Sequence, residues 1–195
     1  MLRNSDVAYG SIAKWVHWST ALLFLGAYAS VYYRQYLTDT DTPGNWNALQ
    51  LHLSFGVTIA VVVLLRIIWR LMNRPPSLEP GTRLEHLAAH AGHYALYAVM
   101  IIMPLTGYLG TGVATDYFFL FEIPKFEDTQ LFTLLVAEGL GLTFEEFEAP
   151  IDTIHKSIMG EWVVWLLILG HALAALYHHY VKKDDTLRKM TTKAS

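Results

Sequence analysis

The chain contains no cysteine among its 195 residues. This absence excludes cysteine-held iron–sulfur clusters, thiolate-ligated haem and the C-x-x-C-H attachment of c-type haem. Any metal centre must therefore use histidine, methionine or carboxylate ligands.

Charged residues are also scarce, because they make up 16% of the chain while 53% of its residues are apolar. That proportion of charge is too low for an ordinary soluble domain. The apolar residues gather in four blocks, at about residues 15–33, 51–70, 88–109 and 158–180, and crossing a bilayer takes about 20 such residues. Backbone groups in lipid must bond within their own segment, so each block predicts a helix. We expect an all-α, integral membrane four-helix bundle that forms one domain over residues 1–195.

The few charges are distributed unevenly between the connections. Basic residues precede the first block, lie between the second and third, and follow the fourth; they are Arg3, Lys14, Arg70, Arg74, Arg83, Lys182, Lys183, Arg188, Lys189 and Lys193. The other two connections carry the acidic residues Asp39, Asp41, Asp116, Glu122, Glu127, Asp128, Glu138, Glu145, Glu146, Glu148 and Asp152, balanced only by Arg34, Lys125 and Lys156. The positive-inside rule predicts that both termini are cytoplasmic. Because membrane topology explains the charge, membrane lipid is an expected partner and nucleic acid is not.

The connection over residues 110–157 is much longer than a helix bundle needs. It combines aromatic residues such as Tyr117 and Phe121 with a later acidic stretch. Loops of this length are usually functional or contain short helices of their own. We expect one of these two outcomes here.

Nine histidines are present, and four of them lie at two matching depths of the predicted bundle. His17 and His171 lie towards the basic ends of their blocks, whereas His52 and His155 lie at the acidic ends. An ionisable residue within a membrane span is costly and is a functional candidate by default. Histidines on facing helices at one depth are typical of haem ligation, although simple hydrogen bonding between helices is the alternative. We therefore predict two stacked haem groups, one held by His17 with His171 and the other by His52 with His155.

The interval between His155 and His171 raises a problem of helix phase. Sixteen steps of about 100° place these residues about 160° apart around a regular helix. Three solutions are open. The helix begins after His155, it deforms near Gly160, or another group such as Met159 is the outer ligand.

Further polar residues fall near the basic end. His86, His90 and His93 follow i, i+4, i+7 spacing, and polar anchoring at the membrane interface is favoured over metal binding for them. Arg66 and Arg70 are expected to reach the lipid headgroups or to pair with a haem propionate.

Several stretches carry a resemblance to a known family; they are Lys14–Trp18, Leu51–His52, His90–His93 with Leu96–Tyr97, Phe118–Pro124 and His171–Met190. Together they resemble the bacterial cytochrome b561 family, which is related to the cytochrome b subunits of nickel–iron hydrogenases. The resemblance covers the chain except for about residues 129–143. It implies two b haems with iron ligands His17, His52, His155 and His171, in a multi-pass protein of the bacterial inner membrane. It also implies electron exchange with a membrane quinone such as ubiquinone, and some members oxidise superoxide at the periplasmic face.

Three functions are compatible with these observations. The leading hypothesis is a quinone-linked oxidoreductase that transfers electrons across the membrane through two haem b groups. The second is a membrane-anchor cytochrome b that relays electrons for a periplasmic or membrane-bound dehydrogenase or hydrogenase. The third is a haem-free transporter of metal ions or protons, which is disfavoured because Glu161 is the only carboxylate within the four blocks.

Overall fold

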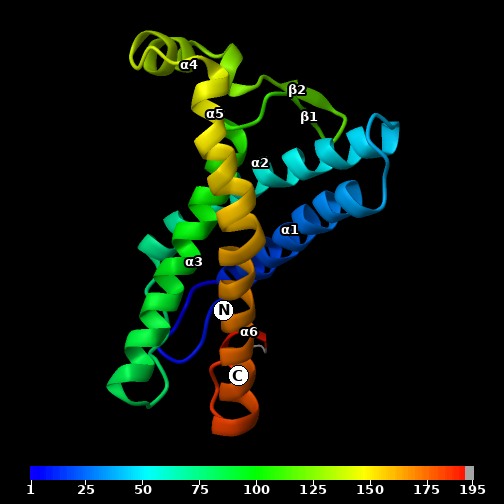
Figure 1. Ribbon diagram of the computed structural model, residues 1–195. Helices are drawn as coiled ribbons and strands as arrows, with labels where there is room; N and C mark the ends of the chain where they lie inside the picture. The colour runs from blue at the N-terminus through cyan, green and yellow to red at the C-terminus, as the bar shows by residue number, and fades with distance from the viewer. Residues whose placement is uncertain (192–195) are drawn as a thin grey trace.

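Four long helical segments make up most of residues 1–191, the part of the chain that the computed structural model describes (Figure 1). The first three are α1 (Ser11–Tyr36), α2 (Pro43–Met72) and α3 (Arg83–Leu109). The fourth is one continuous helix that contains α5 (Phe144–Asp152), η3 (Thr153–Val163), α6 (Val164–Tyr177) and η4 (His178–Lys182). In Figure 1, α1 and α2 lie side by side and cross α3 and α6 obliquely.

Three of these segments are long and apolar enough to cross a membrane. Within residues 1–191 they are α2, α3 and the helix over Phe144–Lys182. The segment α1 is not among them, and its sequence includes Lys14, His17 and several aromatic residues with polar groups that lower its mean hydropathy. The prediction of an all-α membrane chain is confirmed as a mostly helical structure with three candidate spans.

The fourth helix begins earlier than the sequence pattern predicts. It starts at Phe144 rather than near residue 158. The Thr143 side chain accepts a hydrogen bond from the Glu146 backbone N–H, and the Glu146 side chain accepts one from the Thr143 backbone, which forms a capping box. The start was missed because this first part of the helix is acidic, and apolar content alone defined the predicted span.

The long connection before this helix is structured. It contains the strands β1 (Thr115–Tyr117) and β2 (Phe121–Ile123), the short helices η1 (Phe126–Asp128) and α4 (Gln130–Phe132), and the π-helical segment η2 (Thr133–Glu138). The two strands pair antiparallel, and the short helices pack through Phe126, Phe132 and Val136. The expectation of short helices within this connection is confirmed.

Two buried polar residues of α2 hold the β1–β2 hairpin against that helix. The Gln50 amide donates to the Ala114 carbonyl at 3.2 Å and accepts from the Asp116 N–H at 2.7 Å. The Ser54 hydroxyl accepts from the Phe118 N–H at 2.9 Å. The exposed fractions of Gln50 and Ser54 are 1% and 0%. The side chains therefore satisfy backbone groups of the hairpin that would otherwise be buried without partners.

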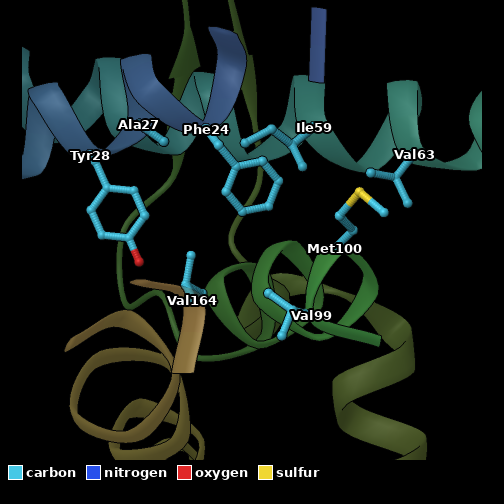
Figure 2. Packing of buried hydrophobic residues seen from close by; sticks show 8 residues of the cluster. All are labelled: Phe24, Ala27, Tyr28, Ile59, Val63, Val99, Met100 and Val164. Carbon is cyan, nitrogen blue, oxygen red and sulfur yellow. The ribbon is translucent and has the colours of Figure 1, made fainter. Parts of the chain in front are cut away.

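All four long segments contribute to one apolar core (Figure 2). Its buried members are Phe24, Ala27, Tyr28, Ile59, Val63, Val99, Met100 and Val164. The Tyr28 hydroxyl donates to the Gly160 carbonyl at 2.8 Å, so its polar atom is paired across the core. This contact ties α1 to the fourth helix at the centre of the structure.

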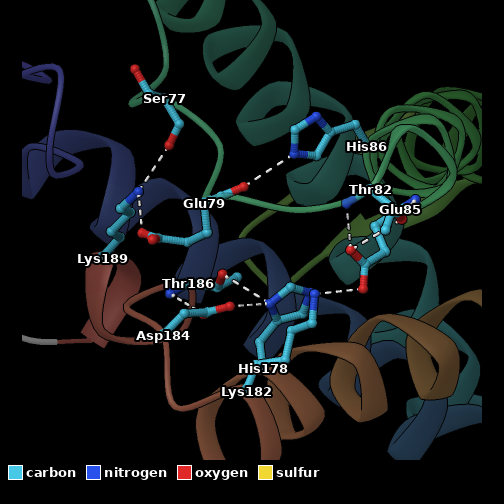
Figure 3. Close-up of polar contacts among 10 residues, drawn as sticks. All are labelled: Ser77, Glu79, Thr82, Glu85, His86, His178, Lys182, Asp184, Thr186 and Lys189. Atoms are coloured by element: carbon cyan, nitrogen blue, oxygen red, sulfur yellow. Dashed lines mark hydrogen bonds and ion pairs between the residues drawn. The ribbon is translucent and has the colours of Figure 1, made fainter.

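The N-terminal segment and the tail over residues 183–191 pack at one end of the molecule, beside the 73–82 connection, and this end is called the basic end (Figure 3). The Ser77 N–H donates to the Asp6 carbonyl at 3.0 Å, and Lys189 forms an ion pair with Glu79 at 2.6 Å. The opposite end, which carries the hairpin and α5, is called the acidic end.

The C-terminal tail is also held by its own polar contacts. The Asp184 carboxylate is paired with the His178 ring at 2.5 Å and accepts from the Thr186 N–H at 3.0 Å. Partial burial raises the pKa of Asp184, but the hydrogen bonds from His178 and Thr186 lower it by more, so its pKa lies below the ordinary value. Lys193, one of the predicted basic residues, lies outside the described residues.

We predict that replacing Gln50 with Ala destabilises the acidic end. The Ala114 carbonyl and the Asp116 N–H lose their partner, which costs about 2 kcal/mol or more. Thermal unfolding of the detergent-solubilised protein should show a lower Tm for Gln50→Ala, with Gln130→Ala, an exposed position in the same region, as the control. An equal Tm for both variants would contradict this role for Gln50.

Candidate functional site

His52 and His155 face each other near the acidic end. Their ring centroids are 6.2 Å apart, and they belong to α2 and η3. The Nδ1 atom of His52 lies 2.9 Å from the Ala27 carbonyl oxygen. A carbonyl only accepts, so Nδ1 donates and the lone pair of the neutral ring is on Nε2. His52 thus has the tautomer that ligates a metal through Nε2.

A threonine of α3 orients His155 in the same way. The Thr106 hydroxyl lies 2.7 Å from the Ile102 carbonyl and 3.1 Å from Nδ1 of His155. The single hydroxyl proton goes to the carbonyl, so Nδ1 of His155 donates to Thr106 and Nε2 carries the lone pair. Gly107 permits this close approach, because a Cβ there would lie 3.0 Å from Cε1 of His155.

The helix deformation that brings His155 to this position is the π-helical segment η3, which contains Gly160. Each π-turn takes in about one residue more than an α-turn. Nine of the eleven residues of η3 lie from His155 onwards, so they absorb about two of the sixteen steps to His171. The remaining steps, about fourteen at about 100°, bring His171 to within about 40° of the His155 face. Among the three alternatives considered for the helix phase, the structure shows the deformation near Gly160. Met159, the alternative ligand, packs against the apolar core.

Three histidines gather towards the basic end. The ring centroid of His171 lies 6.1 Å from that of His17 and also 6.1 Å from that of His93. These residues belong to α6, α1 and α3 respectively. The predicted pair of His17 and His171 is therefore brought together, with a third imidazole beside it.

Arg66 distinguishes this level from the acidic-end pair. Its Nη2 atom lies 3.1 Å from Nδ1 of His17, and its guanidinium lies 5.5 Å from the centre of the Tyr97 ring. Arginine only donates, so Nδ1 of His17 accepts, and the proton of the neutral ring is on Nε2. His17 must lose this contact with Arg66 before its Nε2 atom can bind a metal.

Both histidine pairs have the spacing of two imidazoles that bind one metal ion. With a metal-to-nitrogen bond of about 2 Å and about 1 Å from nitrogen to ring centre, two such rings have centroids about 6 Å apart. The observed distances of 6.1 Å and 6.2 Å agree with this value. Two imidazoles without cysteine are also the donor set of a b-type haem.

A cavity of about 580 Å³ adjoins the acidic-end pair, and both His52 and His155 line it. The rest of its wall is almost entirely apolar and includes Phe24, Val63 and Met100. Cofactor cavities are typically about 300–1,000 Å³ and mostly apolar, with a few polar groups that orient the ligand. The residues present at this level therefore fit a haem in spacing, tautomer and surroundings.

Two of the remaining predicted polar residues, His86 and His90, bond to backbone carbonyls. Within residues 1–191, no three metal-binding side chains are close enough to share an ion. His86 bonds to the Glu79 carbonyl at 3.1 Å, and His90 bonds to the His86 carbonyl at 2.7 Å. These contacts agree with polar anchoring at the basic end.

Two functionally relevant contacts were not predicted from the sequence. The first is the contact of His93 with His171, because spacing along α3 grouped His93 with His86 and His90 instead. The second is the support of His155 by Thr106, since a single threonine within an apolar block carries no signal of its own. Neither contact could be read from the spacing of residues within one helix.

Comparison with known proteins covers nearly the whole chain. A profile of the family described as prokaryotic cytochrome b561 matches residues 8–193. The chain is 29% identical to cytochrome b561 homolog 2 of Escherichia coli K12, over 98% of this chain and 95% of that protein.

Two further relatives are similar over most of their length. The chain is 29% identical to the probable superoxide oxidase CybB of Yersinia pestis, over 95% of this chain and 96% of that protein. It is 28% identical to cytochrome b561 homolog 1 of Escherichia coli K12, over 90% and 92% respectively. Taken with the three candidate spans and the paired imidazoles, these similarities show that the chain is a bacterial membrane protein that belongs to the prokaryotic cytochrome b561 family.

Proposed function

We propose that this chain transfers electrons across the bacterial inner membrane through two b haems and exchanges them with a membrane quinone. The family supports electron transfer through b-type haem. The observation that carries the number of haems is the presence of two imidazole pairs, each with ring centroids about 6 Å apart, at opposite ends of the spans.

Each histidine pair would hold one haem. His52 and His155 would ligate the acidic-end haem through Nε2, while Ala27 and Thr106 keep their rings in position. His17 and His171 would ligate the basic-end haem. When bound, haem iron supplies reversible one-electron oxidation and reduction. The protein's part would be to hold the ligand imidazoles in position and to exclude water from the acidic-end cavity.

The two levels are far enough apart to carry electrons through most of the bilayer. Arg66, which contacts His17, lies fourteen residues after His52 on the regular helix α2. Fourteen residues at about 1.5 Å each span about 21 Å, compared with about 30 Å for the hydrocarbon core. We infer that α1 is the fourth crossing, because it packs along α2 with Lys14 at the basic end and Arg34 at the acidic end.

Charge supports a cytoplasmic location for the basic end and hence for both termini. The 73–82 connection, the N-terminal segment and the C-terminal tail meet there, and most of the basic residues lie in these regions or in the helix turns next to them. The positive-inside rule then assigns this end to the cytoplasm and the acidic end to the periplasm. The domain over residues 1–195 would be a single dihaem unit.

Oxidation of superoxide at the acidic end is a second candidate reaction, favoured by the name of the Yersinia pestis relative. The charges do not favour it. Lys125 is bonded to Glu127, Lys156 to Asp152, and Arg34 donates to Asn45, so these three cations are held by separate partners. An anionic substrate is steered by gathered positive charge, and these contacts do not gather it.

The other two hypotheses have less support. A role as the membrane anchor of a partner dehydrogenase or hydrogenase stays a prediction that an isolated electron-transfer assay would test. A haem-free transporter is disfavoured by membership of a cytochrome family.

We predict that each proposed ligand is needed for one haem. His171→Ala and His52→Ala should each lower the haem content of the purified protein from about two to about one per chain, measured by the pyridine haemochrome assay. His86→Ala is the matched control, because His86 bonds only to the backbone near the basic end. Full haem content in both ligand variants would remove the assignment.

A second prediction concerns the π-helical segment. Deleting Ser157 and Ile158 should convert η3 towards a regular α-helix while His155 and His171 stay close to one face, so both haems should remain bound. Deleting Val61 and Val62 from the regular helix α2 instead rotates its two halves by about 200° relative to each other and should release haem. Loss of haem from both deletions, measured by optical spectroscopy, would count against this account of η3.

A further inference from the structure

An exposed apolar helix face lies at the acidic end, on the short helix over residues 130–138 that α4 and η2 form together (Figure 1). Phe132 and Val136 on this helix belong to the buried aromatic cluster beneath it. Its leucines and the leucine just after it have exposed fractions of 59–64%. These residues, called the leucine patch, are Leu131, Leu134, Leu135 and Leu140. A helix that is apolar on two faces needs a cover for both.

Acidic residues flank the leucine patch. Residues 125–148 include six acidic residues and one basic residue, Lys125, so the formal charge of this stretch is −5. Lys125 is itself bonded to Glu127. Glu138 ends η2, and Glu145 is exposed in the first turn of α5, which contacts η2. An exposed apolar centre with a charged rim is typical of a protein docking surface.

Aromatic packing connects the leucine patch with the histidine pair at this end. The ring centroid of Phe132, on the patch helix, lies 5.7 Å from that of Phe126. The Phe126 ring centroid lies 6.3 Å from that of Tyr108. Tyr108 lines the cavity that His52 and His155 also line. Two ring contacts therefore join the patch helix to the wall of the proposed haem site.

The charge of the rim favours a basic protein over lipid as the cover of the patch. Helices that lie in a membrane interface are rich in Lys and Arg, which attract anionic lipid. Residues 125–148 contain Lys125 alone of these two residue types. An acidic rim also repels the same rim on a second copy of this chain. A protein with a positively charged surface is attracted by it.

We infer that the leucine patch docks a water-soluble electron-carrier protein whose surface is basic around an apolar centre. This inference rests on the proposed electron transfer and on the proposed periplasmic location of the acidic end. Opposite charges steer the two proteins together, and the leucines supply the contact. The exchange moves one electron from the reduced protein to the oxidised carrier, and no bond forms or breaks and no proton is transferred.

The size of the leucine patch suits a transient partner. Full burial of one leucine removes about 100 Å² of apolar surface from water, so the four leucines offer about 400 Å² at most. Stable complexes bury about 800 Å² on each partner, whereas electron-transfer encounters bury less than about 600 Å² on each. An electron carrier must leave after each transfer, which a small contact area permits.

The first test uses the haem-loaded protein in detergent and mitochondrial cytochrome c, a small basic one-electron carrier, as the probe. Glu138→Gln combined with Glu145→Gln removes two charges of the rim. Asp39→Asn combined with Asp41→Asn removes two charges from the α1–α2 connection and is the matched control. Calorimetric titration at low ionic strength should show at least fivefold weaker binding to the rim variant and less than a twofold change in the control. Equal weakening in both variants would mean attraction by overall charge and would overturn the patch assignment.

A second test concerns the apolar centre. Leu131→Ser combined with Leu135→Ser makes the centre polar, and Leu37→Ser combined with Leu120→Ser changes two exposed leucines elsewhere at the acidic end. Stopped-flow spectroscopy should show that electron transfer from the dithionite-reduced protein to ferric cytochrome c slows by at least fivefold in the first variant only. Haem content and the optical spectrum should be unchanged in both. An unchanged rate in the patch variant would overturn the role of the leucines.

A label on the patch distinguishes a carrier from lipid and from a second copy. Because the chain has no cysteine, Leu134→Cys takes a thiol-reactive fluorophore at that position alone. In phosphatidylcholine vesicles, aqueous iodide should quench the label, and cytochrome c should protect the label from iodide. Quenching by doxyl-labelled lipid instead would make the patch a membrane contact. Protection that rises with protein density without cytochrome c would make it a contact between copies, and either result would overturn the inference.

The remaining outcomes separate this inference from the proposed function. If the unmodified protein contains haem and reduces ubiquinone-1 but not ferric cytochrome c, the docking assignment is wrong and the electron-transfer function stands. If the unmodified protein contains no haem, the proposed function itself fails.

Discussion

A polar ring inside an apolar layer must find its hydrogen-bond partner within the protein, and this constraint organises both histidine levels. The His52 ring hydrogen-bonds to the Ala27 carbonyl, the His155 ring to the Thr106 hydroxyl, and the His17 ring to the Arg66 guanidinium. Each contact occupies Nδ1, which leaves the lone pair on Nε2 in His52 and His155 but on Nδ1 in His17. The same contacts join α1 to α2 and α3 to the fourth helix.

The two histidine levels differ in how well their ring tautomers and surroundings suit a metal ion. At the acidic end both Nδ1 atoms donate, and an apolar cavity adjoins the pair. At the basic end His17 accepts from Arg66, and His171 has two imidazoles at equal distance. The acidic-end pair is therefore the one whose tautomers already suit metal binding through Nε2.

The irregular helix η3 is possible because its neighbours satisfy the altered backbone. A π-helical segment is rare and occurs mostly within α-helices, frequently at functional sites. The Tyr28 hydroxyl donates to the Gly160 carbonyl within this segment. Gly160 itself has no side chain to clash, whereas a Cβ there would lie 2.8 Å from the His155 carbonyl oxygen. The position of His155 thus depends on residues from two helices.

The sequence by itself determined the class of the protein, three of its spans and the four candidate ligands. Runs of apolar residues and the cost of histidine in lipid are local properties, so they can be read along the chain. The tertiary structure alone decided the π-helical phase of His155, the Gln50 contact with the hairpin and the place of His93 beside His171. These features depend on which helix faces meet, and that is set by packing between segments distant in the chain rather than by the residues of any one helix.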